Sequence, residues 1–243
     1  MEPEAYVEMA EVEDRHWWFR GRREILRSVI AGLPLPGSPR ILEIGAGTGG
    51  NLTMLSQFGS VKALETDDYA RSIAWRRTND RVDIRQGHLP DGIPFNDEFD
   101  LVCLFDVLEH VERDLDSLKA IRRIISYNGC LLLTVPAYSW LWSAHDERLH
   151  HVRRYTAAGL TEKTRLAGWT VRRITYFNTL LFPLAVVARV TDKIFPGRQP
   201  SGTGIPAPVV NSALYRVFSI EKALLRAFDF PFGVSLMAQL YSY

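Results

Sequence analysis

The sequence has few cysteines and no excess of charge of either sign. Its two cysteines, Cys103 and Cys130, both fall in apolar segments, which is typical of buried thiols in a reducing compartment. A disulfide between neighbouring strands is the alternative. The 29 lysines and arginines balance 28 aspartates and glutamates, so no overall field favours nucleic acid as a partner.

The sequence also lacks the apolar segments that targeting and membrane insertion require. Residues 1–4 are acidic and are not followed by the apolar core of a signal peptide. No uncharged apolar run reaches the ~20 residues that cross a bilayer, and the longest, 174–188, contains Asn178 and Pro183. We therefore expect a cytoplasmic protein, with 243 residues forming one large domain or a core domain with an insertion.

A strand, a glycine-rich turn and the start of a helix follow one another early in the chain. Glycines permit a sharp turn and let a ligand approach the backbone, and the helix start offers unpaired N–H groups. Two motifs fit. Gly45, Gly47 and Gly50 match a dinucleotide pattern, whereas Gly45, Gly47 and Gly49 with Glu43 match E-x-G-x-G-x-G. An acid before the first glycine suits a ligand that carries an ammonium and a sulfonium better than it suits a pyrophosphate.

Strands and helices then alternate, which indicates a parallel α/β sheet. We expect strands at 40–44, 61–65, 82–86, 98–105 and 130–135, and helices within 5–31 and at 50–58, 68–77, 112–126 and 156–167. The second strand ends on Glu65, where a carboxylate suits the two ribose hydroxyls of a nucleoside. The alternative is that one of the neighbouring acids only caps the next helix.

The order and spacing of segments 43–49, Glu65, 106–110 and 128–136 resemble those of class I S-adenosylmethionine (SAM)-dependent methyltransferases, over at least residues 39–177. The resemblance implies a Rossmann-like α/β fold with seven strands, the last antiparallel, and SAM at the carboxyl ends of the strands. In the family an acid often occupies the position of His88, so the backbone of Leu89 is expected to serve the adenine here. The implied cofactor-binding residues are Glu43, Gly45, Ala46, Gly47, Gly49, Glu65, Thr66, His88, Leu89, Phe105, Asp106 and His110.

The last two strands are expected at 169–177 and 232–241. In the family they form a hairpin, but here roughly fifty residues separate them. The insertion comprises an apolar run (177–190), a linker (196–208) and an amphipathic helix N-capped by Asn211 (211–228). It is interpreted as a helical pair packed on the core or forming a homodimer, or as a lid touching the membrane surface or a lipid-like substrate. The expected parts are 1–38 (helical lid), 39–177 (core), 178–230 (insertion) and 231–243 (final strand).

Methyl transfer from a sulfonium is an in-line displacement, and a hydroxyl or amine acceptor also needs a base. The i, i+3, i+4 spacing of Asp106, Glu109 and His110 predicts one side of a helical turn. A similar arrangement occurs with a divalent metal in ubiquinone-type O-methyltransferases. The preferred interpretation here has no metal, with the turn lining the methyl-donor pocket and Glu109 structural.

A second cluster, 140–155, is rich in imidazole, guanidinium and aromatic groups. It follows the fifth strand, at the edge where an acceptor would lie, and the alternative is an exposed loop that caps the next helix. Together with residues 16–23, this cluster also resembles bacterial methyltransferases that are often grouped with glycan and lipid biosynthesis. The candidate catalytic residues are His145, His150 and Tyr155. The candidate substrate-binding residues are Trp17, Arg23, Trp142, Arg153 and Arg154.

The sequence thus predicts a SAM-dependent methyltransferase acting on an oxygen, or less favourably a nitrogen, of a small or lipid-like acceptor carrying an anionic group. Membrane-surface contact through 178–230 would place it at the inner face of the membrane. One alternative is an NAD(P)-dependent oxidoreductase, against which Glu43 argues. The other is a catalytically silent SAM-fold protein that binds a partner or a membrane.

Overall fold

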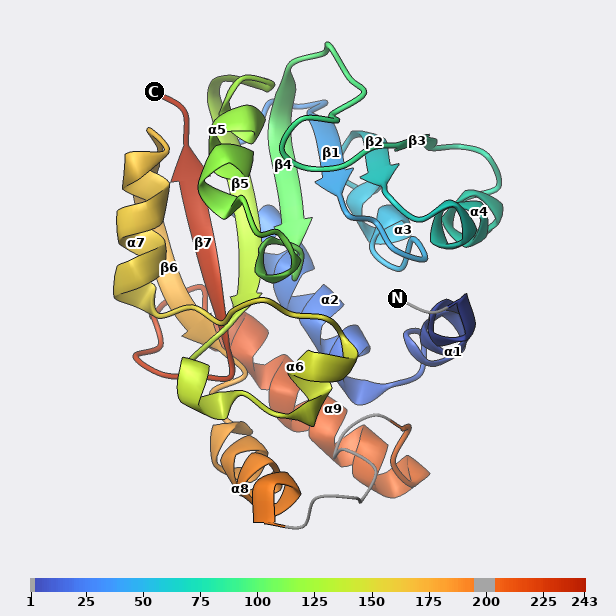
Figure 1. Ribbon diagram of the computed structural model, residues 1–243, viewed down its shortest axis with the longest axis vertical. Helices are drawn as coiled ribbons and strands as arrows, with labels where there is room; N and C mark the ends of the chain where they lie inside the picture. Colours follow the sequence, from blue (N-terminus) through green and yellow to red (C-terminus); the bar gives the residue numbers. More distant parts are fainter. Residues whose placement is uncertain (1–2, 195–203) are drawn as a thin grey trace.

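The computed structural model describes residues 3–194 and 204–243, and a seven-stranded sheet runs through them (Figure 1). The strand order is β3-β2-β1-β4-β5-β7-β6. Only β7 runs antiparallel to the others, between β5 and β6, so the predicted fold is confirmed. The strands are β1 (Arg40–Ile44), β2 (Ser60–Glu65), β3 (Asp83–Gln86), β4 (Phe99–Phe105), β5 (Ile125–Pro136), β6 (Thr170–Phe177) and β7 (Ser235–Tyr241).

Helices cover both faces of this sheet, because its central strands are apolar on both sides. One face packs against α2 (Trp17–Ile30), α3 (Leu52–Leu55), α4 (Asp68–Arg77) and α9 (Pro208–Leu224). The other packs against α5 (Asp114–Arg122) and α7 (Ala157–Leu166). Along β4, Leu101 and Cys103 face the first layer, whereas Val102 faces the second. Cys103 and Cys130 are free and buried.

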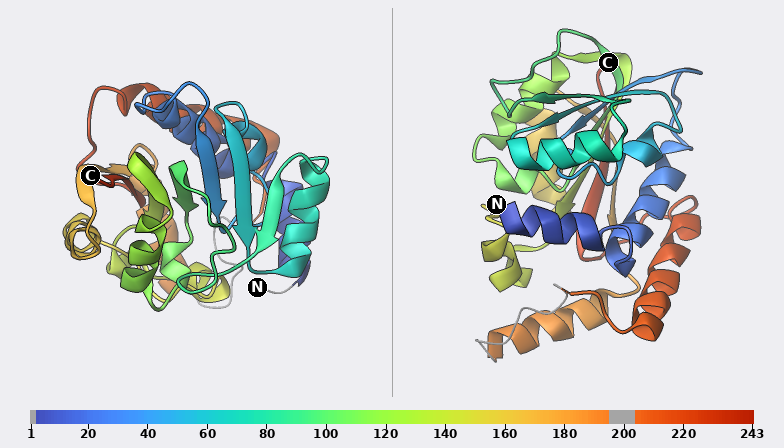
Figure 2. Two further views of the ribbon diagram at one scale, coloured as in Figure 1. Left: turned by 90° about the horizontal axis from the view of Figure 1, so that it is seen from above. Right: turned by 90° about the vertical axis from the view of Figure 1, so that its right-hand side faces the viewer.

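Short helices gather below the carboxyl ends of the parallel strands (Figure 1). They are α1 (Pro3–Val12), the 3-10 helix η1 (Leu108–His110), the 3-10 helix η2 (Ser139–Leu141) and α6 (Ala144–Arg148). Helix α8 (Phe182–Ile194) lies further out, at the end of the molecule opposite the C-terminus (Figure 2, right). No helix in 3–194 or 204–243 is long and apolar enough to span a membrane.

The insertion between β6 and β7 is joined to the N-terminal part of the chain through α9. The ring of Phe218 packs so closely on α2 that a Cβ at Gly21 would lie 2.5 Å from it. The predicted N-cap at Asn211 is wrong, because α9 begins earlier, at Pro208 after Ala207. The Asn211 side chain instead accepts the N–H of Trp17 at 2.9 Å, at the start of α2. Most of the predicted linker, 196–208, lies outside the described residues.

Several predicted boundaries differ from the structure. Helix α3 is a single turn instead of the predicted 50–58. Strand β5 begins at Ile125 instead of 130, and residues 127–129 lie inside it as an irregularity. Asn128 absorbs that irregularity with a left-handed φ of 65°. Strand β7 begins at Ser235 rather than at 232. None of these differences moves the carboxyl edge of the sheet.

Candidate cofactor and acceptor site

The glycine loop after β1 has a backbone that only glycine tolerates. Gly45 and Gly49 have φ values of 73° and 83°, in the left-handed region. A Cβ at Gly45 would lie 2.5 Å from the side chain of Val107, and one at Gly49 would lie 2.9 Å from Ala74. The loop is therefore pressed between the start of η1 and α4, at the carboxyl end of the central strand.

Two buried acids flank this loop. The Glu65 carboxylate accepts the N–H of Gly47 at 2.7 Å and the N–H of Asp67 at 3.0 Å. Glu43 is buried and accepts the side-chain amide of Asn51 at 2.8 Å. Its Oε2 has no hydrogen-bond partner among the described residues. Burial raises the pKa of Glu43 to about 7.

The other predicted cofactor-binding residues follow the strands on either side of β1. Thr66 comes after β2, and its hydroxyl donates to the carbonyl of Gly87 at 2.9 Å. His88 and Leu89 follow β3 in a loop where the side chain of His88 is exposed. Phe105 ends β4. These positions span the point where the strand order reverses, between β1 and β4, which is where α/β sheets bind nucleosides.

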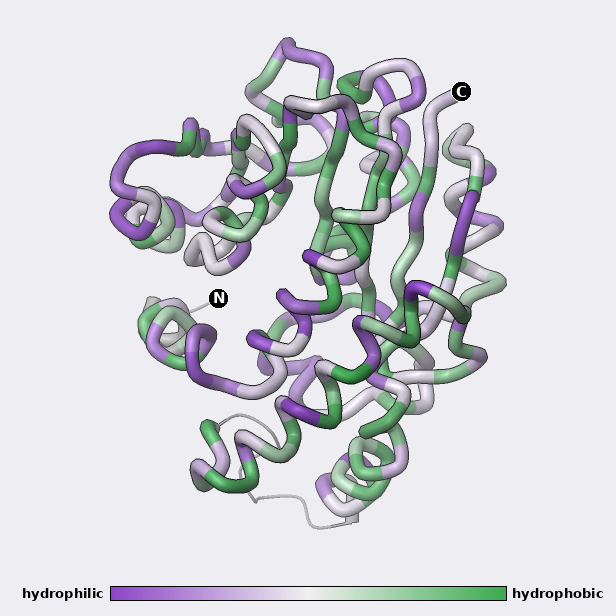
Figure 3. The backbone as a smooth tube through the Cα atoms, turned by 180° about the vertical axis from the view of Figure 1, so that it is seen from behind, coloured by the Kyte–Doolittle hydropathy of each residue, from purple (hydrophilic) through white to green (hydrophobic). Residues whose placement is uncertain are grey.

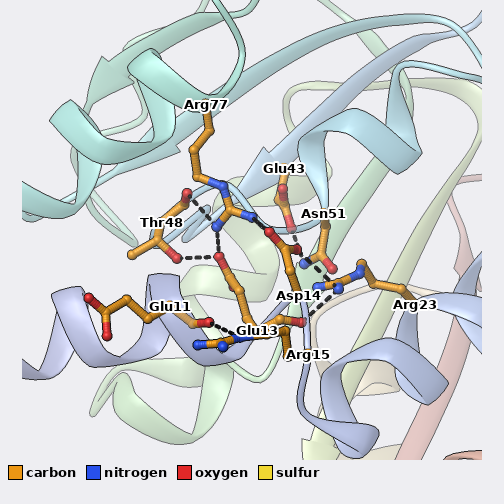
Figure 4. Close-up of polar contacts among 9 residues, drawn as sticks. All are labelled: Glu11, Glu13, Asp14, Arg15, Arg23, Glu43, Thr48, Asn51 and Arg77. Atoms are coloured by element: carbon orange, nitrogen blue, oxygen red, sulfur yellow. Dashed lines mark hydrogen bonds and ion pairs between the residues drawn. The ribbon is translucent and has the colours of Figure 1, made fainter.

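Helix α1 is held over the glycine loop by a polar cluster (Figure 4). The buried carboxylate of Glu13 forms an ion pair with Arg77 and accepts the Thr48 hydroxyl at 2.7 Å. Arg77 also pairs with Asp14 at 2.7 Å. Arg23, a predicted substrate ligand, donates to the Glu13 carbonyl at 2.7 Å, so its guanidinium belongs to this cluster.

Arg22, rather than Arg23, points toward the carboxyl end of β4. It is buried, and its guanidinium forms an ion pair with Asp106 at 2.6 Å. The same group lies 5.6 Å from the centre of the Phe105 ring. Trp17, also predicted to bind substrate, packs edge-on against Phe218 between α2 and α9, with ring centroids 5.7 Å apart. Sequence reasoning missed Arg22 because a one-residue change in helix phase decides which arginine faces inward.

Asp106, Glu109 and His110 were predicted on one side of a helical turn, and this is wrong for Asp106. Its φ of 55° places it in the left-handed region, before η1, where it pairs with Arg22. Glu109 and His110 lie in η1 and gather with His151 instead. The ring centroids of the two histidines are 4.7 Å apart, in an edge-on arrangement.

Arg154 and His151 are held by one fully buried carboxylate, that of Asp146. Arg154 donates to it through Nε at 2.7 Å and Nη2 at 2.9 Å. Nδ1 of His151 lies 2.9 Å from it, and the Ser143 N–H donates at 2.9 Å. The pKa of Asp146 is lowered by the hydrogen bonds from His151 and Arg154, which outweigh its burial. Arg154, a predicted substrate ligand, thus already has its charge balanced within the chain.

Tyr155 and Arg153 converge on a second buried carboxylate, that of Asp114. The Tyr155 hydroxyl donates to it at 2.9 Å and approaches the Leu108 carbonyl at 3.2 Å, and Arg153 forms an ion pair with it. Burial, together with the Asp114 charge, raises the pKa of Tyr155 well above its usual value. This geometry favours an anchoring role for Tyr155 over the predicted role as a base. Trp142, half-buried, follows η2.

His145 and His150 occupy different environments. His145, in the first turn of α6, is half-buried, whereas His150 is exposed and has a left-handed φ of 56°. Burial lowers the pKa of His145 to about 4, and the positive charge of Arg189 lowers it further. His145 is therefore neutral at physiological pH and can accept a proton.

Arg189 reaches this region from α8, and sequence reasoning missed it. Its Nη1 is shielded from solvent and has no hydrogen-bond partner among the described residues. It forms a long ion pair with the Asp192 carboxylate at 3.6 Å, a distance beyond that of a hydrogen bond. Burial and the charge of Arg154 lower the pKa of Arg189. The only signal in the sequence was a single arginine within an apolar run.

Fold and site together define a nucleoside-binding α/β protein, in which glycines and two acids lie at the switch point of a seven-stranded sheet. The chain belongs to the methyltransferase domain family, whose model matches residues 17–174. Its cofactor is SAM. The family match decides between the two interpretations of the glycine motif: it favours SAM, rather than a nicotinamide nucleotide, as the ligand.

Curated relatives agree with this family. The chain is 37% identical over 97 residues, 39% of its length, to an uncharacterized methyltransferase of Staphylococcus carnosus. It is 29% identical over 162 residues, 65% of its length, to a probable SAM-dependent methyltransferase of Mycolicibacterium smegmatis. The matches span 45% and 61% of the lengths of these two relatives.

Solved structures share the fold. A proposed methyltransferase of Haloferax volcanii, determined in complex with a methyltransferase activator, is 19% identical with a TM-score of 0.63. That match covers 98% of this chain and 93% of the other. A SAM-dependent methyltransferase of Thermotoga maritima is 17% identical with a TM-score of 0.59, covering 98% of this chain and all of the other (100%).

The raised pKa of Glu43 predicts how SAM affinity depends on pH. We expect the ammonium of SAM to pair with the ionised carboxylate, so that binding requires Glu43 to lose its proton. We expect SAM affinity to fall by up to ~10-fold per pH unit below about pH 7, and to level off above it. Isothermal titration across this range measures the profile. Glu43→Gln should flatten it, and an unchanged profile in this variant would assign the titration to another group.

The contacts around Glu13 predict that Arg77 slows the escape of SAM. Replacing Arg77 with methionine removes the ion pair that holds α1 over the glycine loop. We expect the SAM dissociation rate to rise roughly 3–10-fold, the effect of losing about 1 kcal/mol of a partly buried contact. Stopped-flow displacement measures this rate. Arg76→Met, a change at the exposed neighbouring arginine, is the control, and equal rates in the two variants would contradict the assignment.

Proposed function

We propose that this methyltransferase transfers the methyl group of SAM to an oxygen of an amphiphilic acceptor that carries an anionic group. The proposal rests mainly on one observation, a solvent-shielded Nη1 of Arg189 in a guanidinium whose positive charge acts on His145. A guanidinium with a shielded Nη1 that has no hydrogen-bond partner among the described residues favours an anionic ligand group, and a neutral imidazole can take the proton of a hydroxyl.

The charges around His145 couple acceptor binding to catalysis. Arg189 is the largest electrostatic contribution that lowers the pKa of this imidazole, after burial. A carboxylate or phosphate bound to Arg189 would offset that charge and raise the pKa of His145 toward the operating pH. Because a general base works best when its pKa lies near that pH, the bound anion would make His145 a better base.

The outer face of α8 supports a lipid-like acceptor and contact with a membrane surface. Arg189 lies on the inner side of this helix, while its outer side exposes apolar residues, and the helix is largely green in Figure 3. A helix with one wide apolar face suits the boundary between lipid headgroups and acyl chains. The exposed apolar residues of the helix are Leu184, Val187 and Val190, and Leu180 just before it is also exposed.

Transfer of label from SAM to fractionated extracts tests the proposal. The protein is incubated with methyl-labelled SAM and with acidic-lipid, neutral-lipid and water-soluble fractions of bacterial extract. We expect label in the acidic-lipid fraction, and its loss in Arg189→Met. Label only in neutral or water-soluble compounds would contradict the proposed acceptor. SAM binding without turnover in any fraction would favour the catalytically silent alternative.

A further inference from the structure

We propose that Glu109, His110 and His151 form a binding site for one divalent transition-metal ion beside the acceptor site. A potential ligand atom from each of the three residues lies within 4.8 Å of the others. Metal–ligand bonds of about 2.1 Å bring such atoms to roughly 3–4 Å from one another. Small side-chain rotations are enough to close the site around an ion.

The carboxylate of Glu109 provides the first independent observation that points to a cation. Glu109 has no exposed surface, and neither of its carboxylate oxygens has a hydrogen-bond partner among the described residues. An orphaned buried carboxylate is costly, because burial removes its water without replacing the lost hydrogen bonds. A bound cation beside it would supply the missing interaction.

The orientation of the His151 ring provides the second independent observation that points to a cation. Its Nδ1 lies 2.9 Å from the Asp146 carboxylate, which Arg154 holds in place through two hydrogen bonds. Nδ1 therefore carries the hydrogen, and Nε2 keeps a free lone pair. A carboxylate bonded to the far nitrogen is the common support of a metal-binding histidine, since it fixes both the tautomer and the ring orientation.

The backbone fixes the distance between the two segments that supply the ligands. The N–H of Val152 donates to the carbonyl of Glu109 at 2.8 Å, so the residue after His151 is tied directly to η1. Asp106 is not part of the site, because its charge is paired with Arg22. The site therefore comprises one carboxylate and two imidazoles from two segments that the fold holds together.

This donor set indicates the class of metal. Imidazole favours zinc, iron, cobalt, nickel and copper, whereas magnesium and calcium prefer oxygen ligands. Three protein ligands leave open coordination positions, as in catalytic rather than structural metal sites. Metal binding follows from this geometry alone and holds whether or not the proposed acceptor is correct.

The consequence for catalysis rests on the proposed function. An acceptor hydroxyl bound at an open position would have a lowered pKa, because the cation stabilises the oxyanion. The hydroxyl proton passes to His145. The oxygen then forms a bond to the methyl carbon as the carbon–sulfur bond of SAM breaks, and S-adenosylhomocysteine leaves with the electron pair on sulfur.

Titration of the metal-stripped, full-length protein with Co²⁺ tests the site without any acceptor. We expect one ion to bind per chain, with a visible absorption spectrum typical of mixed nitrogen and oxygen ligation. Glu109→Gln and His110→Asn should each weaken binding at least ~10-fold, the usual effect of losing a ligand or its support. His150→Ala, at an exposed histidine outside the trio, should bind as the wild type does.

Two results would overturn the proposal. One is the absence of Co²⁺ or Zn²⁺ binding by the wild type at millimolar concentration. The other is equal binding by the wild type, Glu109→Gln and His110→Asn. Because the side chain of His110 is exposed, its replacement should leave the fold intact, and circular dichroism of this variant verifies that. A failure of the acceptor assay with metal binding intact would contradict the proposed function alone.

Discussion

Replacing His145 with alanine should slow methyl transfer by roughly 10²–10⁴-fold while SAM affinity stays within about three-fold. The expectation follows if this neutral, half-buried imidazole accepts the acceptor's proton, and the positive charge of Arg189 acts on it. Because its pKa is about 4 before the acceptor binds, kcat/KM for the acceptor, measured at saturating SAM, should show no loss of a base between about pH 6 and 8.

Single-turnover measurements with labelled SAM and the acidic-lipid fraction give the rate for this variant. Glu147→Gln, an exposed change on the same short helix, controls for the stability of α6. A His145→Ala enzyme with the wild-type rate would place the base elsewhere, and His150→Ala is then the next variant to measure.

Replacing Glu65 with glutamine should weaken SAM binding by roughly 10–100-fold, the effect of losing charge-assisted hydrogen bonds worth about 1.5–3 kcal/mol. Glu65 already accepts two backbone N–H groups, from Gly47 and Asp67. These bonds fix its carboxylate at the end of β2, where the ribose hydroxyls are expected to donate to it.

Isothermal titration with SAM measures the loss for Glu65→Gln. Asp68→Asn removes an equal charge three residues further on, from an exposed carboxylate paired with Arg71, and is the matched control. If both variants lose affinity equally, the effect is one of overall charge rather than of ribose recognition. If neither does, the ribose lies elsewhere on the sheet.

The sequence was sufficient to predict the sheet and the cofactor edge, because both depend on local patterns. Buried strands appear as short apolar runs, and the glycine loop requires glycines at particular positions whatever the surroundings. The two antiparallel contacts of β7 could be predicted only through the family resemblance, since about fifty residues separate β6 from β7.

The acceptor side was predicted less well, because its residues are positioned by contacts that are distant in sequence. Arg153 and Arg154 looked like ligands for an anion, but buried acids at 114 and 146 bind them. Arg189 stands within an apolar run, and its positive charge lowers the pKa of His145. His151 joins Glu109 only because the strand order of the sheet brings the ends of β4 and β5 together.

The N-terminal helices are a second case in which contacts distant in sequence decide which residues face the site. Helical periodicity predicts that some of the arginines at 20–23 face inward, but the phase of α2 decides which ones. That phase depends on where α2 starts, and the side chain of Asn211, nearly two hundred residues away, contributes to it by accepting the Trp17 N–H. A sequence pattern carries no information about such a contact.

The identity of the methylated atom tests the central claim most directly. The protein is supplied with SAM labelled with ¹³C in its methyl group and with the acidic-lipid fraction, and the product is analysed by carbon–proton correlation spectroscopy. We expect a single methyl resonance in the region of methoxy groups, in a product that keeps its acidic group. A methyl resonance in the N-methyl or C-methyl region, or a product without an acidic group, would contradict the account.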